Sequence, residues 1–160
     1  MRSLVIVYSF HHKNTLKVAG KIASVLDAEI MKPDQVRIED LSGYDLIGFG
    51  SGIYDAKHHD SVLELARNLT HNDDVKVFIF STTGVPKIGF NEEFVAENHK
   101  SLRTVLELRQ IEVVGDFSSL GHNTNSFLKF TSGLNKGRPN HEDLRRAEEF
   151  ALKLREEIVK

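Results

Sequence analysis

The chain has 160 residues, of which 40% are hydrophobic and 28% charged, and its formal net charge is −2. These totals are typical of one globular domain spanning residues 1–160. The slightly negative net charge gives no indication of the concentrated basic face that nucleic-acid binding usually requires. There is no cysteine, which excludes disulfides, thiolate catalysis and cysteine-ligated metal centres. No apolar run approaches the roughly 20 residues that span a bilayer, and the N-terminus lacks a signal-peptide pattern, so we expect a cytoplasmic protein.

The first part of the chain predicts a strand, a polar loop and a helix. Residues 4–8 form a short, uninterrupted and β-branched run, as expected of a strand that is buried on both faces. Apolar residues at helical spacing then predict a helix over residues 14–27. A helix N-terminus has unpaired N–H groups and a partial positive charge, so this polar loop is a natural place for a phosphate.

The rest of the chain alternates between strands and helices. Further strands are expected at residues 28–31, 45–50, 75–80 and 111–117, and further helices at residues 60–70, 92–109 and 140–159. The strand at residues 45–50 is predicted to end in a Gly-Ser-Gly turn at residues 50–52. Asn140 and Asp143 predict a capping box for the last helix. This alternation predicts an α/β fold with a mostly parallel five-stranded sheet and helices on both faces. In such sheets, ligands bind beyond the carboxyl ends of the strands, so we expect one composite site there.

The first loop carries the strongest candidate site. Its side chains offer hydroxyl, amide, imidazole and ammonium groups, all suited to a phosphate: Ser9, His11, His12, Lys13, Asn14 and Thr15. An alternative is that Asn14 and Thr15 only cap the helix. The loop matches neither the P-loop nor the dinucleotide-binding pattern, because the glycines of those motifs are absent.

The stretch 8–15 resembles the phosphate loop of the flavodoxins, whose usual pattern is Thr or Ser, any residue, Thr, Gly, Asn, Thr before the first helix. Asn14 and Thr15 match its end, whereas Lys13 stands where the family usually has glycine. His11 and His12 stand near its hydroxyl residues. The resemblance implies a flavodoxin-like three-layer sandwich with five parallel strands in the order 2-1-3-4-5 and FMN as the cofactor.

The resemblance also assigns the flavin ring and ribityl chain to two later loops. Ser51, Gly52, Ile53 and Tyr54 lie in a segment similar to the one that lines the isoalloxazine ring, with Gly52 near flavin N5 and Tyr54 stacked on the ring. Ser81, Thr82, Thr83 and Gly84 lie in a segment similar to the one that contacts the pyrimidine edge and ribityl chain. Without the resemblance, both segments are ordinary turns.

Residues 118–139 form a polar connection that is too long to be routine. It leaves the carboxyl end of a strand and is predicted to form a partner-docking surface, a cover over the site or a solvated loop. The side chains considered for docking are Asn123, Asn125, Lys129, Asn135, Lys136 and Arg138. The adjacent pairs His11-His12 and His58-His59 do not indicate a metal site, since neighbouring side chains diverge and no third ligand follows at helical spacing.

The resemblance favours an FMN-binding electron-transfer protein that has no catalytic residue and meets two redox partner proteins, a reductase and an electron acceptor. An alternative is an FMN-dependent NAD(P)H/quinone-type oxidoreductase on the same fold, with residues 118–139 as a roof over a second substrate. A flavin-free interaction module also stays open. A signalling receiver domain is excluded, because Ser9-Phe10 and Gly50-Ser51 occupy the places of its acidic residues.

Overall fold

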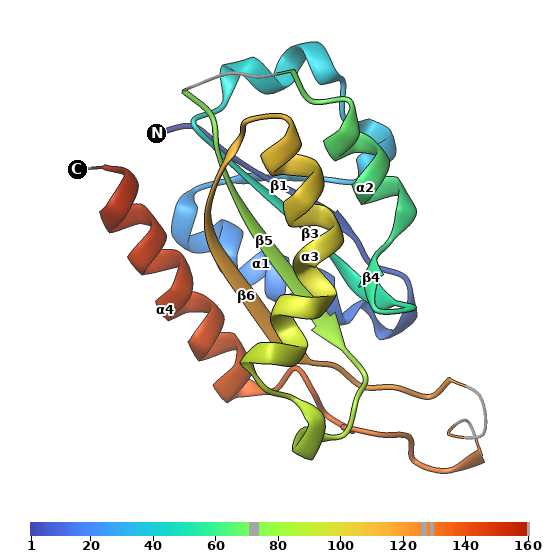
Figure 1. Cartoon of the computed structure of the whole chain (residues 1–160). Coiled ribbons are helices and arrows are strands. Elements are labelled where there is room, and N and C mark those ends of the chain that lie inside the picture. Colours follow the sequence, from blue (N-terminus) through green and yellow to red (C-terminus); the bar gives the residue numbers. More distant parts are fainter. Residues whose placement is uncertain (71–73, 126–127, 129, 160) are drawn as a thin grey trace.

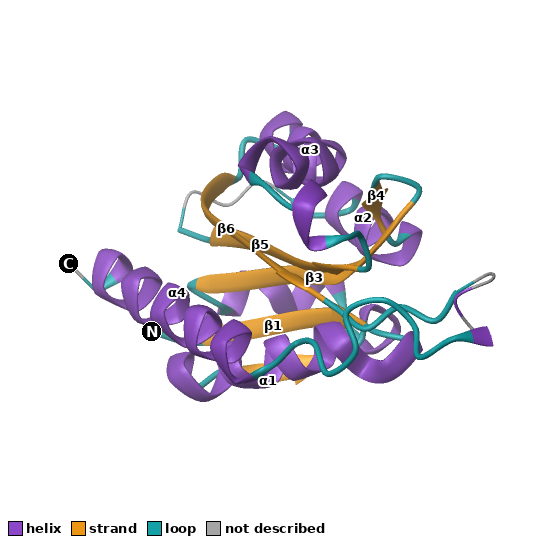
Figure 2. Cartoon of the chain, turned by 90° about the horizontal axis from the view of Figure 1, so that it is seen from below, coloured by secondary structure: helices purple, strands orange, loops and turns teal. Residues whose placement is uncertain are grey.

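A twisted sheet forms the middle of three layers, with helices on both of its faces (Figures 1 and 2). The structure is a computed structural model that describes residues 1–70, 74–125, 128 and 130–159. Among these residues, no helix combines the length and the apolarity that crossing a lipid bilayer requires. The sheet with helices on both faces confirms the predicted three-layer α/β sandwich.

Five parallel strands make up the main sheet, in the order β2-β1-β3-β5-β6. Their bounds are β1 Ser3–Tyr8, β2 Glu29–Met31, β3 Leu46–Tyr54, β5 Lys76–Thr83 and β6 Glu112–Leu120. A two-residue strand, β4 (Lys57–His58), pairs antiparallel with the end of β3. Apart from β4, which was not predicted, this is the order 2-1-3-4-5 that the resemblance to flavodoxins implies.

The helices cover the two faces of the sheet in pairs. α1 (Asn14–Leu26) packs beside α4 (His141–Ile158) on one face, and α2 (Asp60–Arg67) packs beside α3 (Glu92–Leu108) on the other (Figure 2). Short 3₁₀ turns lie between them: η1 His11–Lys13, η2 Pro33–Gln35, η3 Ile38–Gly43 and η4 Lys87–Gly89. The capping box is confirmed, since the Asn140 side chain accepts from the Asp143 N–H and the Asp143 carboxylate accepts from the Asn140 N–H.

Strand β3 runs past the Gly-Ser-Gly turn that the sequence predicts. Gly50 and Gly52 stay in the sheet, paired with β1 or β5, and the chain reverses only at Asp55 and Ala56, whose φ angles are 50° and 58°. The prediction of a turn at residues 50–52 is therefore wrong. Gly50 instead makes room for an aromatic ring, since a Cβ there would lie 2.2 Å from Cζ of Phe80. Strands β5 and β6 are likewise three residues longer than predicted at their carboxyl ends.

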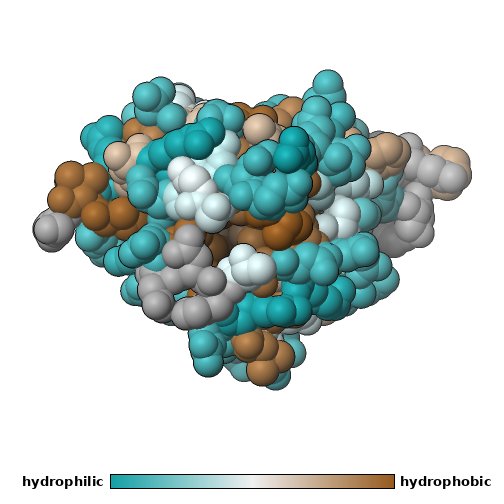
Figure 3. Space-filling model, turned by 90° about the horizontal axis from the view of Figure 1, so that it is seen from above, coloured by the Kyte–Doolittle hydropathy of each residue, from teal (hydrophilic) through white to brown (hydrophobic). Residues whose placement is uncertain are grey.

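A hydrophobic cluster lies on each side of the sheet. The cluster under α1 and α4 includes Val5, Val18, Ile22, Phe78 and Phe80, and the cluster under α2 and α3 includes Ile6, Phe49, Leu63, Ile79 and Leu102. Figure 3 views the amino-terminal edge of the sheet, where an apolar hollow opens within a largely hydrophilic face. The carboxyl edge at the opposite end carries the polar loops.

Candidate functional site

A hollow of about 100 Å³ lies where the carboxyl ends of β1, β3 and β5 meet the segment that follows β6. Its lining is Ser9, Phe10, His11, Asn14, Thr15, Gly52, Ile53, Tyr54, Thr82, Thr83, Gly84, His122, Asn123, Thr124 and Asn125. None of these residues is acidic, and most of them carry a hydroxyl, an amide or an imidazole. Such a lining suits an anionic or strongly hydrogen-bonding ligand.

The loop after β1 reverses sharply before α1 begins. His12 and Lys13 both adopt left-handed backbone conformations, with φ of 51° and 52°. This geometry explains why the flavodoxin pattern has a glycine at the place of Lys13, since glycine adopts positive φ without a steric penalty. Lys13 makes no side-chain cap, and the first turn of α1 is instead capped by Ser9, whose Oγ accepts from the Leu16 N–H at 3.2 Å.

Asn14 and Thr15 join this loop to other parts of the site. Thr15 Oγ1 lies 2.8 Å from Thr82 Oγ1 on β5, and both hydroxyls are buried. Asn14 Nδ2 donates to the His122 carbonyl at 2.9 Å, while its buried Oδ1 has no partner. Asn14 and Thr15 therefore do more than cap the helix, because both form hydrogen bonds to residues far away in the chain.

Tyr54 borders the hollow from the end of β3. A Cβ added at Gly52 would lie 3.1 Å from the Tyr54 hydroxyl, which shows that the Tyr54 ring folds back over its own strand. Its ring meets those of Tyr8 and His59 edge-on, and these two are themselves stacked with centroids 3.5 Å apart. Burial, with a smaller contribution from Tyr8, raises the pKa of the Tyr54 phenol. Tyr54 is therefore neutral at physiological pH.

The segment after β6 forms a fourth side of the hollow. Asn123 Nδ2 donates to the Gly84 carbonyl at 3.2 Å, and Asn135 Nδ2 donates to the Val85 carbonyl at 2.8 Å. Gly84 allows this approach, since a Cβ there would lie 2.6 Å from Asn123. The sequence placed this segment on the ligand side but did not single out His122 or Thr124 as site residues. Lys129, one of the side chains considered for docking, lies outside the described residues.

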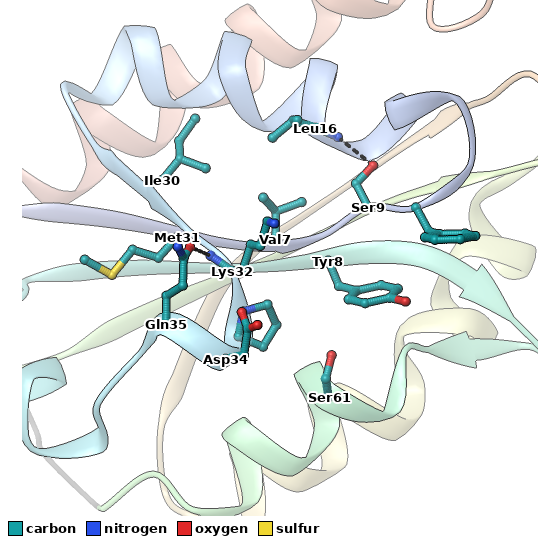
Figure 4. A pocket seen from close by; sticks show the side chains of 12 residues that line it. Val7, Tyr8, Ser9, Leu16, Ile30, Met31, Lys32, Asp34, Gln35 and Ser61 are labelled. Atoms are coloured by element: carbon teal, nitrogen blue, oxygen red, sulfur yellow. Dashed lines mark hydrogen bonds between the residues drawn. The ribbon is translucent and has the colours of Figure 1, made fainter.

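A larger hollow, of about 460 Å³, lies on the other side of the first loop (Figure 4). Apolar side chains of Val7, Leu16, Ile30 and Met31 line much of it. Figure 4 shows the Ser9 hydroxyl turned toward the start of α1, where it caps Leu16. Ser9 and Phe10 line both hollows, so the first loop is the wall between them.

Ten of the fourteen residues predicted to bind the cofactor line the smaller hollow, and four do not. His12 and Lys13 are exposed and do not line the hollow. Ser51 Oγ accepts from the His59 N–H at 2.9 Å and donates to the Gly52 carbonyl at 2.6 Å. Ser81 Oγ lies 2.8 Å from His99 Nε2 and 2.9 Å from Ser118 Oγ. The two serine hydroxyls therefore serve internal networks.

The Ser81 network continues into the protein. His99 Nδ1 lies 2.8 Å from Asp116 Oδ1, and Arg103 also pairs with that carboxylate. Burial alone would raise the pKa of Asp116, but the hydrogen bond and charge of His99, together with Arg103, outweigh it and lower the pKa. Ser, His and Asp in this order have the form of a hydrolase triad. Ser81 is only 1% exposed, however, so the arrangement is structural.

The protein is an open parallel α/β sheet with a hollow rich in hydrogen-bonding groups at its carboxyl edge, the edge at which sheets of this kind bind ligands. The sequence model of a family described as "Flavodoxin domain" matches residues 5–115. The chain belongs to this flavodoxin family.

The chain is also similar to one curated protein in sequence and to solved flavodoxin structures in fold. The chain is 41% identical over 151 residues to the uncharacterized protein MJ0298 of Methanocaldococcus jannaschii, covering 94% of this chain and 96% of that protein. The fold is similar to that of Flavodoxin 2 from Bacillus cereus, with a TM-score of 0.69 and 19% identity over 98% of this chain and 99% of that one. It is also similar to the Fusobacterium nucleatum flavodoxin bound to flavin mononucleotide, with a TM-score of 0.65 and 12% identity over 98% and 99% of the two chains.

Proposed function

We propose that this protein binds FMN at the carboxyl edge of the sheet and transfers electrons between two redox partner proteins, a reductase and an electron acceptor. The observation that carries the proposal is the hollow without acidic residues, lined from the ends of β1, β3 and β5. The flavodoxin family membership and the flavin named for the Fusobacterium nucleatum relative add support.

The donor set of the hollow fits the phosphate of FMN. Hydroxyls of Ser9, Thr15 and Thr82, with the imidazole of His11, lie around the start of α1, whose N-terminal N–H groups and dipole favour an anion. A volume of about 100 Å³ suits a phosphate group and not the three-ring flavin. Gly52, Ile53, Tyr54, Thr83 and Gly84, which border the hollow, are the residues that would hold the ring and ribityl chain.

When bound, FMN supplies the redox chemistry, and the protein sets its environment. Tyr54 stays neutral because its pKa is raised, so it adds no negative charge beside the flavin. Gly52 has no side chain, which lets the Tyr54 ring fold back over the end of β3, so the two residues together would form the surface that faces the flavin ring. No side chain acts as a general acid or base in this proposal.

The visible spectrum of the purified protein, before and after addition of FMN, tests the cofactor. The Asn14→Asp variant places a carboxylate in the hollow and should weaken FMN binding by at least about tenfold through charge repulsion. Asn68→Asp, on the exposed C-terminal end of α2, is the matched control and should bind FMN as the native protein does. Equal FMN affinity of all three proteins would contradict this placement of the phosphate.

The electron-transfer role is tested by mixing the FMN-loaded protein with NADPH or NADH, with and without an added flavodoxin reductase. We expect the flavin to be reduced only when the reductase is present, because the proposed function includes no nicotinamide site. Rapid steady-state oxidation of either nucleotide by the protein alone would overturn the role of electron carrier.

A further inference from the structure

Two histidines from opposite parts of the chain meet at the rim of the smaller hollow. The rings of His12, in the first loop, and His122, after β6, have centroids 4.4 Å apart and planes inclined by 33°. His12 Nε2 also lies 2.8 Å from Thr124 Oγ1. His122 and Thr124 line the hollow themselves, so this contact joins the first loop to the fourth side of the site.

The position of His122 is set by close packing. A Cβ on Gly121 would lie 2.6 Å from Asn14 Nδ2, so the chain passes directly against Asn14, which donates to the His122 carbonyl. The His122 ring places Nε2 3.1 Å from the Ser132 carbonyl, which can only accept. In neutral His122, Nε2 therefore carries the proton and Nδ1 has a free lone pair. Protonation would make Nδ1 a second donor.

The groups that surround His12 are basic. They are His122 from the segment after β6, His11 and Lys13 in the same loop, and Lys17 on α1. Burial first, then His122, His11 and Lys17, lower the pKa of His12. The neutral form of His12 is therefore favoured, in a place where positive charge accumulates if protons are added.

A second observation at the same place indicates a ligand. Asn14 is 9% exposed, lines the hollow, and its Oδ1 is buried without a hydrogen-bond partner. A buried acceptor of this kind normally has a partner, since leaving it unpaired costs about 1–3 kcal/mol. A ligand hydroxyl, such as those of a ribityl phosphate, would supply the missing donor.

We propose that residues 121–125 belong to the phosphate-binding site and that the His12–His122 pair takes up a proton from solvent when a phosphomonoester dianion binds there. The inference rests on the proposed function. It adds the two histidines that would lie near the phosphate and the proton that they would take up when the phosphate binds. The second pKa of a phosphomonoester is about 6, so the group is a dianion above neutral pH. Its charge favours the imidazolium form and offsets the repulsion within the basic cluster. No covalent bond is formed or broken.

Flavins with and without a phosphate provide the test. FMN and riboflavin are titrated into the flavin-free protein at pH 6.5, 7.5 and 8.5, with flavin fluorescence as the readout. Calorimetry in phosphate-free buffers of different ionisation enthalpy counts the protons taken up. We expect FMN affinity to rise as pH falls, by up to about tenfold per pH unit for one proton, and riboflavin affinity to stay constant.

Two variants and a control locate the proton. His12→Asn removes the imidazole and keeps a residue that tolerates the positive φ at this position. His122→Phe keeps a ring against His12 and cannot be protonated. Both should flatten the pH dependence of FMN binding and reduce proton uptake, with riboflavin affinity unchanged. His141→Gln, at the exposed start of α4, is the matched control and should behave as the native protein.

The outcomes separate this inference from the proposed function. FMN binding with the same pH dependence as riboflavin, or without proton uptake, would overturn the inference and leave FMN binding intact. Failure of both flavins to bind would overturn both. These outcomes are measured on the native protein alone, so they do not depend on whether a variant folds.

Discussion

Two histidine pairs of this protein lie near the carboxyl edge of the sheet and differ in almost every property. His58 on β4 and His99 on α3 have ring centroids 5.0 Å apart, and neither is more than 1% exposed. His12 is exposed and His122 is half-buried, with rings 4.4 Å apart. The buried pair joins strand β4 to helix α3, whereas the rim pair joins two loops.

The difference shows how environment decides what an imidazole can do. His58 Nε2 lies 3.2 Å from the Phe80 carbonyl, and burial, with the charge of His99, lowers its pKa to about 3. Its proton state is therefore fixed over the physiological range. His12 of the rim pair is exposed, and the basic groups around it contribute to its lowered pKa, so a bound anion would favour its protonated form.

The largest effect is expected from His58→Leu on the pH dependence of stability. The folded pKa of about 3 lies below the unfolded value of roughly 6.5, so between these values the unfolded chain binds more protons and stability falls as pH falls. Between pH 7 and 4.5, the free energy of unfolding of the native protein should fall by about 2 to 3 kcal/mol more than that of the variant. Urea unfolding at both pH values measures this, and parallel losses in the two proteins would contradict it.

His99→Phe tests the other half of the buried pair. It removes the ring nitrogens that serve Ser81 and Asp116, and it should lower the free energy of unfolding by about 2 kcal/mol at pH 7. The pKa of Asp116, followed by NMR, should rise because a lowering contact is lost. His141→Phe on the surface is the control. An unchanged Asp116 titration in His99→Phe would show that Arg103 alone sets this pKa.

Gly121→Ala tests the packing that holds the rim pair in place. The new Cβ would lie 2.6 Å from Asn14 Nδ2, so the Asn14 side chain must shift and its hydrogen bond to His122 is lost. We expect a loss of about 1 kcal/mol in stability together with weaker FMN binding. Gly89→Ala, where nothing lies within 4 Å of the new Cβ, is the matched control. Equal behaviour of the two variants would contradict the close packing.

The smallest effect on stability is expected from His12→Asn. Because His12 is exposed, its replacement at pH 7 should change the free energy of unfolding by no more than about 0.5 kcal/mol. A loss as large as that of His99→Phe would mean that the rim pair is a structural element like the buried one. Chemical denaturation of both variants under the same conditions makes the comparison.

The sequence by itself determined the architecture. Among the described residues, apolar runs and helical spacing located the five parallel strands and the helices α1 to α4, because hydrophobic periodicity is a local property of the chain. Asn140 and Asp143 form the predicted capping box for the same reason. Asn14 and Thr15, together with the first loop, indicated the family and the edge of the sheet at which a ligand would bind.

Only the tertiary structure decided which side chains reach the site. Ser51 and Ser81 belong to polar segments as the sequence indicates, but strands β3 and β5 continue through them and turn their hydroxyls into the interior. His122 comes to the hollow because Gly121 lets a distant segment pass against Asn14. Such contacts depend on strand length and on packing between residues far apart in the chain, and no local pattern encodes them.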